Sequence, residues 1–243
     1  MASAPVADQL KLLDVQALDT QLAKLAHTRR SHPSIAALEE LTARAQDLER
    51  AQVDARTAVS DARRAVTKAE TDVEQVRARA ARDQQRLDSG AGSAKDMQAL
   101  THELESLANR QSDLEEVELE AMESLEQAEK ALAAISSQRE ALTEQVEQVT
   151  GERDAAFAEL DRQAQTVSGQ RAAAVGGIDA ALVTLYDRVR ERTGGLAALR
   201  LRGTSTEPLR IQLSLTEQAA IDAAPADEVL RSEDGYILVR VND

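Results

Sequence analysis

The stretch LEELTARAQDLERAQVDARTAVSDARRAVTKAETDVEQVRARAARDQQRL, residues 38–87, decides the fold. Its apolar side chains return every seven residues in two interleaved series, and 13 of the 15 positions are apolar, with Gln52 and Asp83 as the exceptions. A seven-residue repeat held over this length predicts a left-handed coiled coil. The first series is Leu38, Ala45, Gln52, Val59, Val66, Val73, Ala80 and Leu87, and the second is Leu41, Leu48, Ala55, Ala62, Ala69, Val76 and Asp83.

Helix is expected to begin before this stretch. Apolar residues at three- and four-residue steps predict a first helix over residues 6–28, and Pro33 disfavours helix at His32. The coiled-coil helix is then expected over residues 34–88, which is roughly 80 Å at a rise of about 1.5 Å per residue.

Residues 89–93, SGAGS, interrupt the repeat with two glycines. Ser93 and Asp96 have the spacing of a capping box, which predicts that a new helix begins directly after the break. The repeat resumes at Met97, and this helix is expected over residues 94–193.

The short loop sets the expected arrangement of the two long helices. A short loop between heptad helices favours antiparallel neighbours. Folding the chain about Gly92 pairs residues whose numbers add up to about 184, which places Ala62 opposite Ala121. Small side chains then meet small ones and large meet large. We therefore predict a mainly α protein whose residues 1–193 form a helical coiled-coil hairpin, with a kink at Gly176-Gly177.

The composition excludes several classes of protein. Aromatic residues make up 1% of the 243 residues, too few for the core of a large enzyme domain. Without cysteine there is no thiolate nucleophile and no disulfide, and no nucleophile is placed beside any of the three histidines. A net charge of −14 opposes unspecific binding to nucleic acid or anionic membranes. We expect no enzyme, no cofactor, no metal and no membrane association, and a cytoplasmic location.

The last fifty residues change character, and we expect a small α+β domain over residues 194–243. Gly194-Gly195 ends the helix, and LRIQL at 209–213 alternates like a strand. Ser214 and Glu217 predict a second capping box, which opens a short helix ending before Pro225. A β-hairpin is expected over residues 228–231 and 236–241, with a turn at Asp234-Gly235.

The order of these parts resembles a family of mostly uncharacterised bacterial coiled-coil hairpin proteins that end in a four-cysteine zinc ribbon. The resemblance covers nearly the whole chain. It is carried by SGAGSAKDMQALTHELESL at 89–107, by LYDRVRERTGGLAALRLRG at 185–203, and by LRIQLSLTEQAAI followed by EVLRSEDGYILVR near the end. It implies an adaptor role, with partners in the transcription or export machinery, since some relatives are linked to a sigma factor.

This chain departs from the family at the zinc site. The positions of the two cysteine pairs fall around residues 206–209 and 232–235, and we single out Thr206, Leu209, Ser232 and Asp234 as the degenerate ligand region. Oxygen donors are poor substitutes for four thiolates around zinc. We therefore expect a metal-free ribbon held by a small core of Leu209, Ile211, Leu213, Ile221, Leu230, Ile237 and Val239.

Two further regions are candidate binding sites. Arginines concentrate where the long helix meets the C-terminal domain, and they predict a nucleic-acid or anion patch, although cations also suit a helix C-terminus. The exposed tip of the hairpin is a candidate partner-binding site, although its glycines also serve the turn. The patch is Arg188, Arg190, Arg192, Arg200, Arg202 and Arg210, and the tip residues are Ser93, Lys95, Asp96 and Met97.

Three functions are compatible with these features. The first is a non-enzymatic adaptor or scaffold that binds protein partners through the coiled-coil rod and the small C-terminal domain. The second is a nucleic-acid-binding protein that uses the arginine cluster. The third is a purely structural rod that associates with itself.

Overall fold

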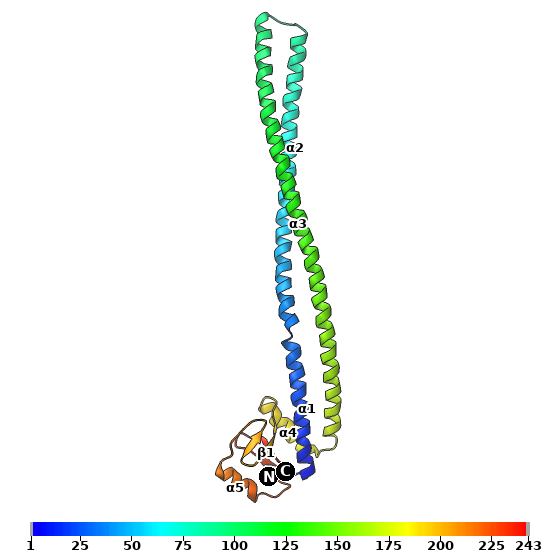
Figure 1. Cartoon of the computed structure of the whole chain (residues 1–243), viewed down its shortest axis with the longest axis vertical. Coiled ribbons are helices and arrows are strands. Elements are labelled where there is room, and N and C mark those ends of the chain that lie inside the picture. Colours follow the sequence, from blue (N-terminus) through cyan, green and yellow to red (C-terminus); the bar gives the residue numbers. More distant parts are fainter. Residues whose placement is uncertain (1, 242–243) are drawn as a thin grey trace. The chain divides into compact units, whose positions relative to one another are not determined.

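The computed structural model describes residues 2–241 and divides into two compact units (Figure 1). The hairpin unit comprises residues 36–150, and the sheet unit comprises the residues up to 35 together with those from 151 onward. The helices are α1 (Val6–Arg30), α2 (Pro33–Asp88), α3 (Ala94–Val175), α4 (Ala180–Arg192) and α5 (Leu215–Ala223). The strands are β1 (Ala198–Arg202), β2 (Ser205–Glu207), β3 (Leu230–Arg231) and β4 (Ile237–Arg240).

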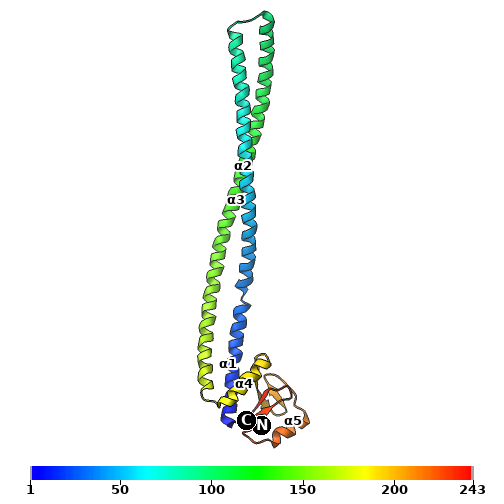
Figure 2. The same cartoon turned by 180° about the vertical axis from the view of Figure 1, so that it is seen from behind.

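In the hairpin unit, α2 and α3 run side by side and cross one another, as seen from the front and from behind (Figures 1 and 2). Every residue of the two heptad series on α2 is buried or half-buried, and so are the residues of the matching series on α3 from Met97 to Val149. The predicted coiled-coil hairpin is therefore confirmed position by position.

The turn between the two long helices also follows the prediction. The backbone N–H of Ser93 donates to Asp96 Oδ2 at 2.9 Å, and the N–H of Asp96 donates to Ser93 Oγ at 3.3 Å. Gly90 and Gly92 have φ angles of 62° and 150°, a region in which side chains with a Cβ are strained. The glycines let the chain turn, and the capping box starts α3.

Ion pairs across the seam show the register of the hairpin. Arg63 and Arg77 follow first-series residues by four positions and lie on one side of the seam, whereas Arg79 directly precedes such a residue and lies on the other side. The pairs are Arg63–Glu129 at 2.7 Å and Arg77–Glu115 at 2.5 Å on the first side, and Arg79–Glu103 at 2.6 Å on the second. The residue numbers of each pair on the first side add up to 192, and those of the pair on the second side add up to 182. Residues of α2 and α3 therefore lie at the same height along the hairpin where their numbers add up to the mean of these two sums, about 187.

The predicted register is therefore displaced by about one layer. Ala62 lies level with Leu125 rather than with Ala121, so a small side chain faces a large one. This alternation is the usual way for two helices to interdigitate in an antiparallel seam. The loop length alone does not determine the register, because α2 and α3 need not leave the turn symmetrically.

One polar layer interrupts the apolar seam. Gln52 is 8% exposed and donates from Nε2 to Ser136 Oγ at 3.1 Å, while its Oε1 accepts from Arg139 Nη1. Both Gln52 and Arg139 occupy seam positions, and each provides the partner that the other needs. A buried polar pair of this kind typically fixes the register of a coiled coil at some cost in stability.

The kink predicted at Gly176-Gly177 is a complete break, so the interruption lies where the sequence placed it but the single helix predicted over residues 94–193 is wrong. α3 ends at Val175, and Asp179 caps the new helix α4 by accepting from the N–H groups of Ala181 at 2.9 Å and Leu182 at 3.0 Å. α1 stabilises the turn, since Lys11 Nζ donates to the Gly177 carbonyl at 2.6 Å. The break lets α4 turn and pack on α1.

The four strands form one sheet in the order β2-β1-β4-β3, with β1 and β4 parallel and the two outer pairs antiparallel. The C-terminal hairpin is confirmed as β3 and β4, and Gly235 takes φ 85° in the turn between them. The N-terminal segment lies beside the residues that lead into the edge strand β3, where the Ala4 N–H donates to the Asp227 carbonyl at 2.8 Å. Segments at the two ends of the chain therefore build one unit.

The strand predicted at 209–213 is wrong, since only Gln212 makes an isolated bridge there, to Ser205. The segment is held as a tight loop by Thr206, whose N–H donates to the Ile211 carbonyl at 3.3 Å. The first strand of the sheet is β1, ALRLR, which lies in the stretch 185–203 that carries the family resemblance and for which no strand was predicted.

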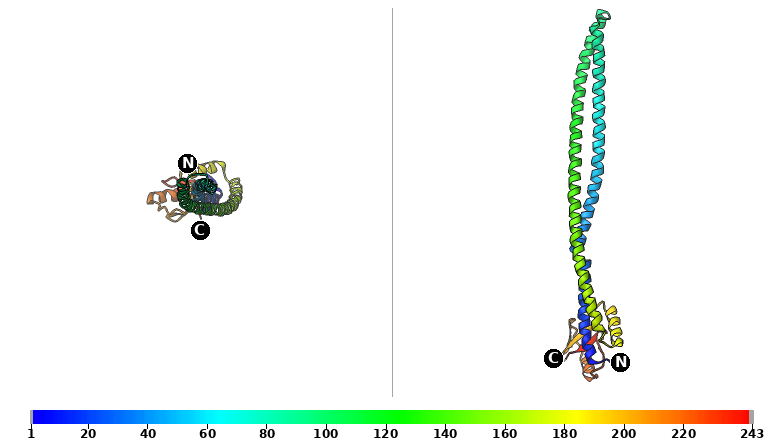
Figure 3. Two further views of the ribbon diagram at one scale, coloured as in Figure 1. Left: turned by 90° about the horizontal axis from the view of Figure 1, so that it is seen from above. Right: turned by 90° about the vertical axis from the view of Figure 1, so that its right-hand side faces the viewer.

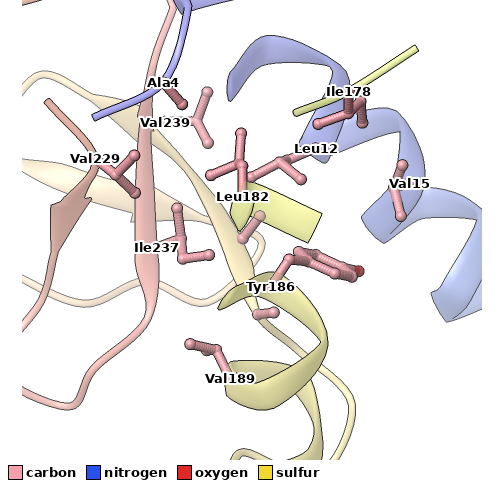
Figure 4. Close-up of a cluster of buried hydrophobic side chains, with 12 residues drawn as sticks. Ala4, Leu12, Val15, Ile178, Leu182, Tyr186, Val189, Val229, Ile237 and Val239 are labelled. Atoms are coloured by element: carbon pink, nitrogen blue, oxygen red, sulfur yellow. The ribbon is translucent and has the colours of Figure 1, made fainter. Parts of the chain in front are cut away.

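The main core lies between one face of the sheet, α1 and α4 (Figure 4; Figure 3 shows α1 beside the sheet and α4). Ile237 and Val239 face this core, whereas Leu238 faces a smaller cluster on the other side of the sheet, as alternation along a strand requires. The main cluster is Ala4, Leu12, Val15, Ile178, Leu182, Tyr186, Val189, Ala197, Ala198, Val229, Ile237 and Val239. The smaller cluster is Leu199, Leu213, Leu230 and Leu238, with Ile211 and Ile221 packed against it.

The residues predicted to form the core of the C-terminal segment are thus split between two clusters. The assignment of Leu209 to that core is wrong, because its side chain is 42% exposed. The sheet buries one face against α1 and α4, so the structure does not divide at the predicted boundary of residue 194. A segment of about fifty residues is too small to bury its own core, and α1 and α4 supply the missing surface. Among the described residues, no helix has an apolar run long enough to span a membrane.

Candidate interaction sites

A buried carboxylate organises the sheet unit. Asp19 is 1% exposed and accepts from Tyr186 Oη at 2.9 Å and from Arg171 Nε at 2.7 Å, and Arg190 Nη2 lies 3.4 Å away. Burial, and then the negative charge of Asp19, raise the pKa of Tyr186 above its usual range. The same carboxylate raises the pKa of Arg171. The group is a structural junction of α1, α3 and α4.

Gln16, one turn before Asp19, ties α1 to the start of the sheet. Its Oε1 accepts from the N–H groups of Ala197 at 2.6 Å and Ala198 at 3.2 Å, and its Nε2 donates to the Gly195 carbonyl at 3.0 Å. Sequence reasoning missed both polar residues. A signal was present, because Asp19 continues the helical spacing of the buried Leu12 and Val15 and so had to be buried too.

The structure separates the six predicted patch arginines into two groups. Three make internal contacts: Arg190 with Asp19, Arg192 with the Gly235 carbonyl at 3.0 Å, and Arg202 with Glu207 at 3.4 Å. The other three, Arg188, Arg200 and Arg210, are exposed and make no ion pair with any residue in the range 2–241. The cluster is therefore not one continuous surface of free cations.

Arg200 and Arg210 both line a cleft between α1, β1 and the loop that follows β2. This sheet cleft has a volume of about 580 Å³, and Lys24 contributes a third cation to it. Its remaining wall is mixed, with apolar Leu13 and Ala17 from α1 and one carboxylate, Glu207. The cleft thus combines three cations that lack internal ion pairs with an apolar strip, a surface that suits an acidic and partly apolar ligand.

The tip residues are placed as the sequence suggested, but two of them serve the turn. Ser93 and Asp96 are occupied by the capping box, whose hydrogen bonds lower the pKa of Asp96 below its usual range. Met97 is half-buried against Gly92, and Lys95 is exposed. Of the four tip residues, Lys95 has the freest side chain.

Hydroxyl groups close the two loops of the degenerate ligand region. Thr206 is fully buried; its hydroxyl donates to the Leu209 carbonyl at 2.5 Å and accepts from Ile211 N–H at 3.2 Å. Ser232 is 7% exposed, and its hydroxyl accepts from Tyr236 N–H at 3.1 Å. Leu209 and Asp234 are exposed. Over the described part of the chain, no group of three or more His, Cys, Asp or Glu side chains is placed to hold a metal ion.

These features define a protein with a long antiparallel helical hairpin and a small sheet built on its first and last segments. Residues 15–194 match the sequence profile of the CT398-like coiled coil hairpin domain, and the chain belongs to that family.

Two curated relatives match nearly the whole chain, and both are described as uncharacterised proteins. The proteins MT2288 and Rv2229c from two strains of Mycobacterium tuberculosis are each 36% identical to this chain over 239 residues, which is 98% of this chain and 97% of theirs.

Solved structures extend the likeness to the whole chain. A Mycobacterium smegmatis protein is 34% identical, with a TM-score of 0.84 over 98% of this chain and all of its own. CT398 from Chlamydia trachomatis has a TM-score of 0.70 at 14% identity over 97% of this chain and 98% of its own. HP0958 from Helicobacter pylori has a TM-score of 0.52 at 12% identity over 98% and 99%. At such low identity, the last two show the shared fold alone.

Proposed function

We propose that this protein is a non-enzymatic adaptor, and that its sheet cleft binds an acidic, partly apolar segment of a partner protein. The carrying observation is the meeting of Lys24, Arg200 and Arg210 around one cleft in a chain whose net charge is −14. Each of the three cations lacks an internal ion pair among the described residues, so a partner carboxylate gains a charge-assisted hydrogen bond without displacing an existing one.

A protein ligand fits the cleft better than a nucleic acid does. Three of the six patch arginines are occupied by internal contacts, which leaves few free cations for a phosphate backbone, and Leu13 and Ala17 give the cleft an apolar strip that a partly apolar peptide contacts. The net negative charge of the chain also opposes a long polyanion. Nucleic-acid binding through Arg188, Arg200 and Arg210 is the second candidate, favoured by their shared exposure.

The hairpin serves as a scaffold that carries the tip, with Lys95 as the residue to test there for a second partner. The C-terminal sheet acts as a metal-free counterpart of a zinc ribbon, with the hydroxyls of Thr206 and Ser232 closing its two loops. The protein works in the cytoplasm, and components of the transcription or export machinery are the first partners to test.

The experiment measures binding of two fluorescent probes to the full chain: a short peptide rich in glutamate and leucine, and a short single-stranded RNA. The test variant carries Lys24→Glu and Arg200→Glu, and the matched control carries Arg30→Glu and Arg188→Glu. The control makes the same change of charge at exposed cations of the sheet unit that lie outside the cleft.

The proposal expects the peptide to bind, and the cleft variant to weaken its affinity at least about tenfold while the control leaves it unchanged. Preferential RNA binding that is lost in either variant supports the nucleic-acid function instead. Peptide affinity equal in all three proteins shows that the cleft is not the binding site.

A further inference from the structure

The two sides of the hairpin seam expose different apolar and charged side chains. Met122 lies seven residues after Glu115 and seven before Glu129, so it shares the side of the seam on which Arg63 and Arg77 form their ion pairs. We call this the Arg63 side. Val117 lies two heptads after Glu103 and therefore belongs to the opposite side.

On the Arg63 side, α2 contributes a basic groove. The groove has a volume of about 780 Å³, its floor includes Val59 and Leu132, and Arg56, Arg64 and Lys68 lie along its wall. Three hydroxyl residues and Arg63 fill most of the remaining wall, and Asp72 is its one carboxylate. This is a concentration of positive charge on a strongly acidic chain.

On the same side, α3 contributes an acidic strip with exposed apolar side chains. Leu119 is 58% exposed and Met122 is 51% exposed, large values for apolar residues on the surface of a coiled coil. Glu115, Glu116 and Glu123 lie around them on the adjoining helical positions. The strip therefore has the opposite charge to the groove and matching apolar character.

Four charged side chains on these two surfaces make no ion pair within the described chain. They are Arg56 and Lys68 on α2, and Glu116 and Glu123 on α3. Some exposed charges of this hairpin pair with a neighbour one helical turn away, as Arg44 does with Glu40, and others, such as Glu120, do not. The unpaired charges of the two surfaces are complementary to each other.

We propose that the Arg63 side binds a second copy of this chain, with the acidic strip of each copy seated on the basic groove of the other. The two surfaces lie at the same level of the hairpin, since α2 and α3 residues are level where their numbers add up to about 187. A two-fold axis along the hairpin then places each α2 on the partner's α3 at that level, in a parallel pair of hairpins. An axis across the hairpin brings α2 onto α2 and opposes like charges.

The test is sedimentation equilibrium of the full chain at low ionic strength. Arg56→Glu with Lys68→Glu, and separately Glu116→Lys with Glu123→Lys, are each expected to weaken self-association at least about tenfold. Mixing the two variants restores association, because the reversed charges complement one another between unlike copies. Rising salt weakens the wild-type dimer, since these charges are exposed.

A matched pair of apolar variants separates the proposed surface from a general effect on the hairpin. The double substitution Leu119→Ser with Met122→Ser is expected to weaken association. Val117 is 50% exposed on the other side of the seam, and Val117→Ser is expected to leave association unchanged. A monomeric wild-type chain at tens of micromolar, or failure of the mixed charge variants to associate, overturns the proposal.

Energy transfer between labelled tips determines the orientation. The chain has no cysteine, so Lys95→Cys gives one labelling site at the tip of each copy. Strong transfer within the dimer is expected for parallel hairpins, and a dimer without transfer overturns the parallel arrangement. The surface is separate from the sheet cleft, so each of the two proposals can fail without the other.

Discussion

The two units of this protein are stabilised in different ways. The sheet unit contains fully buried side chains from distant segments, including Leu12, Tyr186 and Ile237, and one carboxylate shared by several donors. The seam of the hairpin unit is mostly half-buried and repeats the same contact many times. A repetitive seam spreads its stability over many positions, whereas the sheet unit concentrates it in a few.

The largest effect is expected for Asp19→Ala. The change leaves Tyr186, Arg171 and Arg190 without their shared acceptor, and removing one partner of a buried ion pair costs about 3–5 kcal/mol. Denaturant unfolding followed by near-ultraviolet circular dichroism reports on this unit, because all three aromatic residues belong to it. The control is Asp187→Ala, which removes an exposed partner of Arg171 and is expected to cost less than about 1 kcal/mol. Equal costs contradict the role assigned to Asp19.

A pair of leucine truncations compares the two units directly. Leu12→Ala in the sheet unit is expected to cost about 3 kcal/mol, since Leu12 is 1% exposed. Leu125→Ala in the half-buried seam is expected to cost about 1 kcal/mol, because less surface is buried there and Ala62 opposite is already small. Unfolding followed by far-ultraviolet circular dichroism measures both. A seam truncation that costs as much as the core truncation refutes the contrast.

Alkaline pH gives a third comparison. The pKa of Tyr186 is higher in the folded chain than in the unfolded chain, where it lies near 10. Its contribution to stability is therefore complete below pH about 10 and is lost as the pH rises above that value, by at most about 1.4 kcal/mol per pH unit. Stability measured from pH 8 to 11 in the wild type and in Tyr186→Phe is expected to converge at the alkaline end. Parallel curves show that Tyr186 ionises equally in both states.

The smallest change in stability is expected for the double substitution Gln52→Leu with Arg139→Leu. An apolar layer replaces the polar one, so stability stays within about 1 kcal/mol or rises. The register is expected to loosen instead. Oxidative crosslinking of Ala62→Cys with Leu125→Cys, against Ala62→Cys with Ala121→Cys, measures the register. The wild-type background favours the first pair, and the apolar variant is expected to lose that preference.

Sequence periodicity predicted the hairpin well because its information is local. Each heptad position reports its own burial, and the capping boxes at Ser93 and Ser214 fix two helix starts from four-residue patterns. The register was displaced by one layer because it depends on contacts between residues far apart in the sequence, such as Gln52 with Arg139, which the loop does not encode.

The sheet unit was predicted less well, since its decisive contacts join segments more than 150 residues apart. Gln16 and Asp19 form hydrogen bonds with residues of α3, α4 and the start of the sheet. No pattern in the sequence around Gln16 and Asp19 identifies those partners. The sheet cleft depends on the same distant packing of α1 on β1. The predicted arginine cluster therefore identified two cleft residues, Arg200 and Arg210, but missed Lys24.

The contact of Ala4 with Asp227 has a consequence for synthesis of the chain on the ribosome. α2 and the facing part of α3 can pair as soon as both have emerged, because their contacts close over the short turn at residues 89–93. α1 is made before α2 but must wait for β4, which is translated more than 200 residues later. Until then the apolar face of α1 lacks its final partner, so α1 needs protection for longer than the helices of the hairpin do.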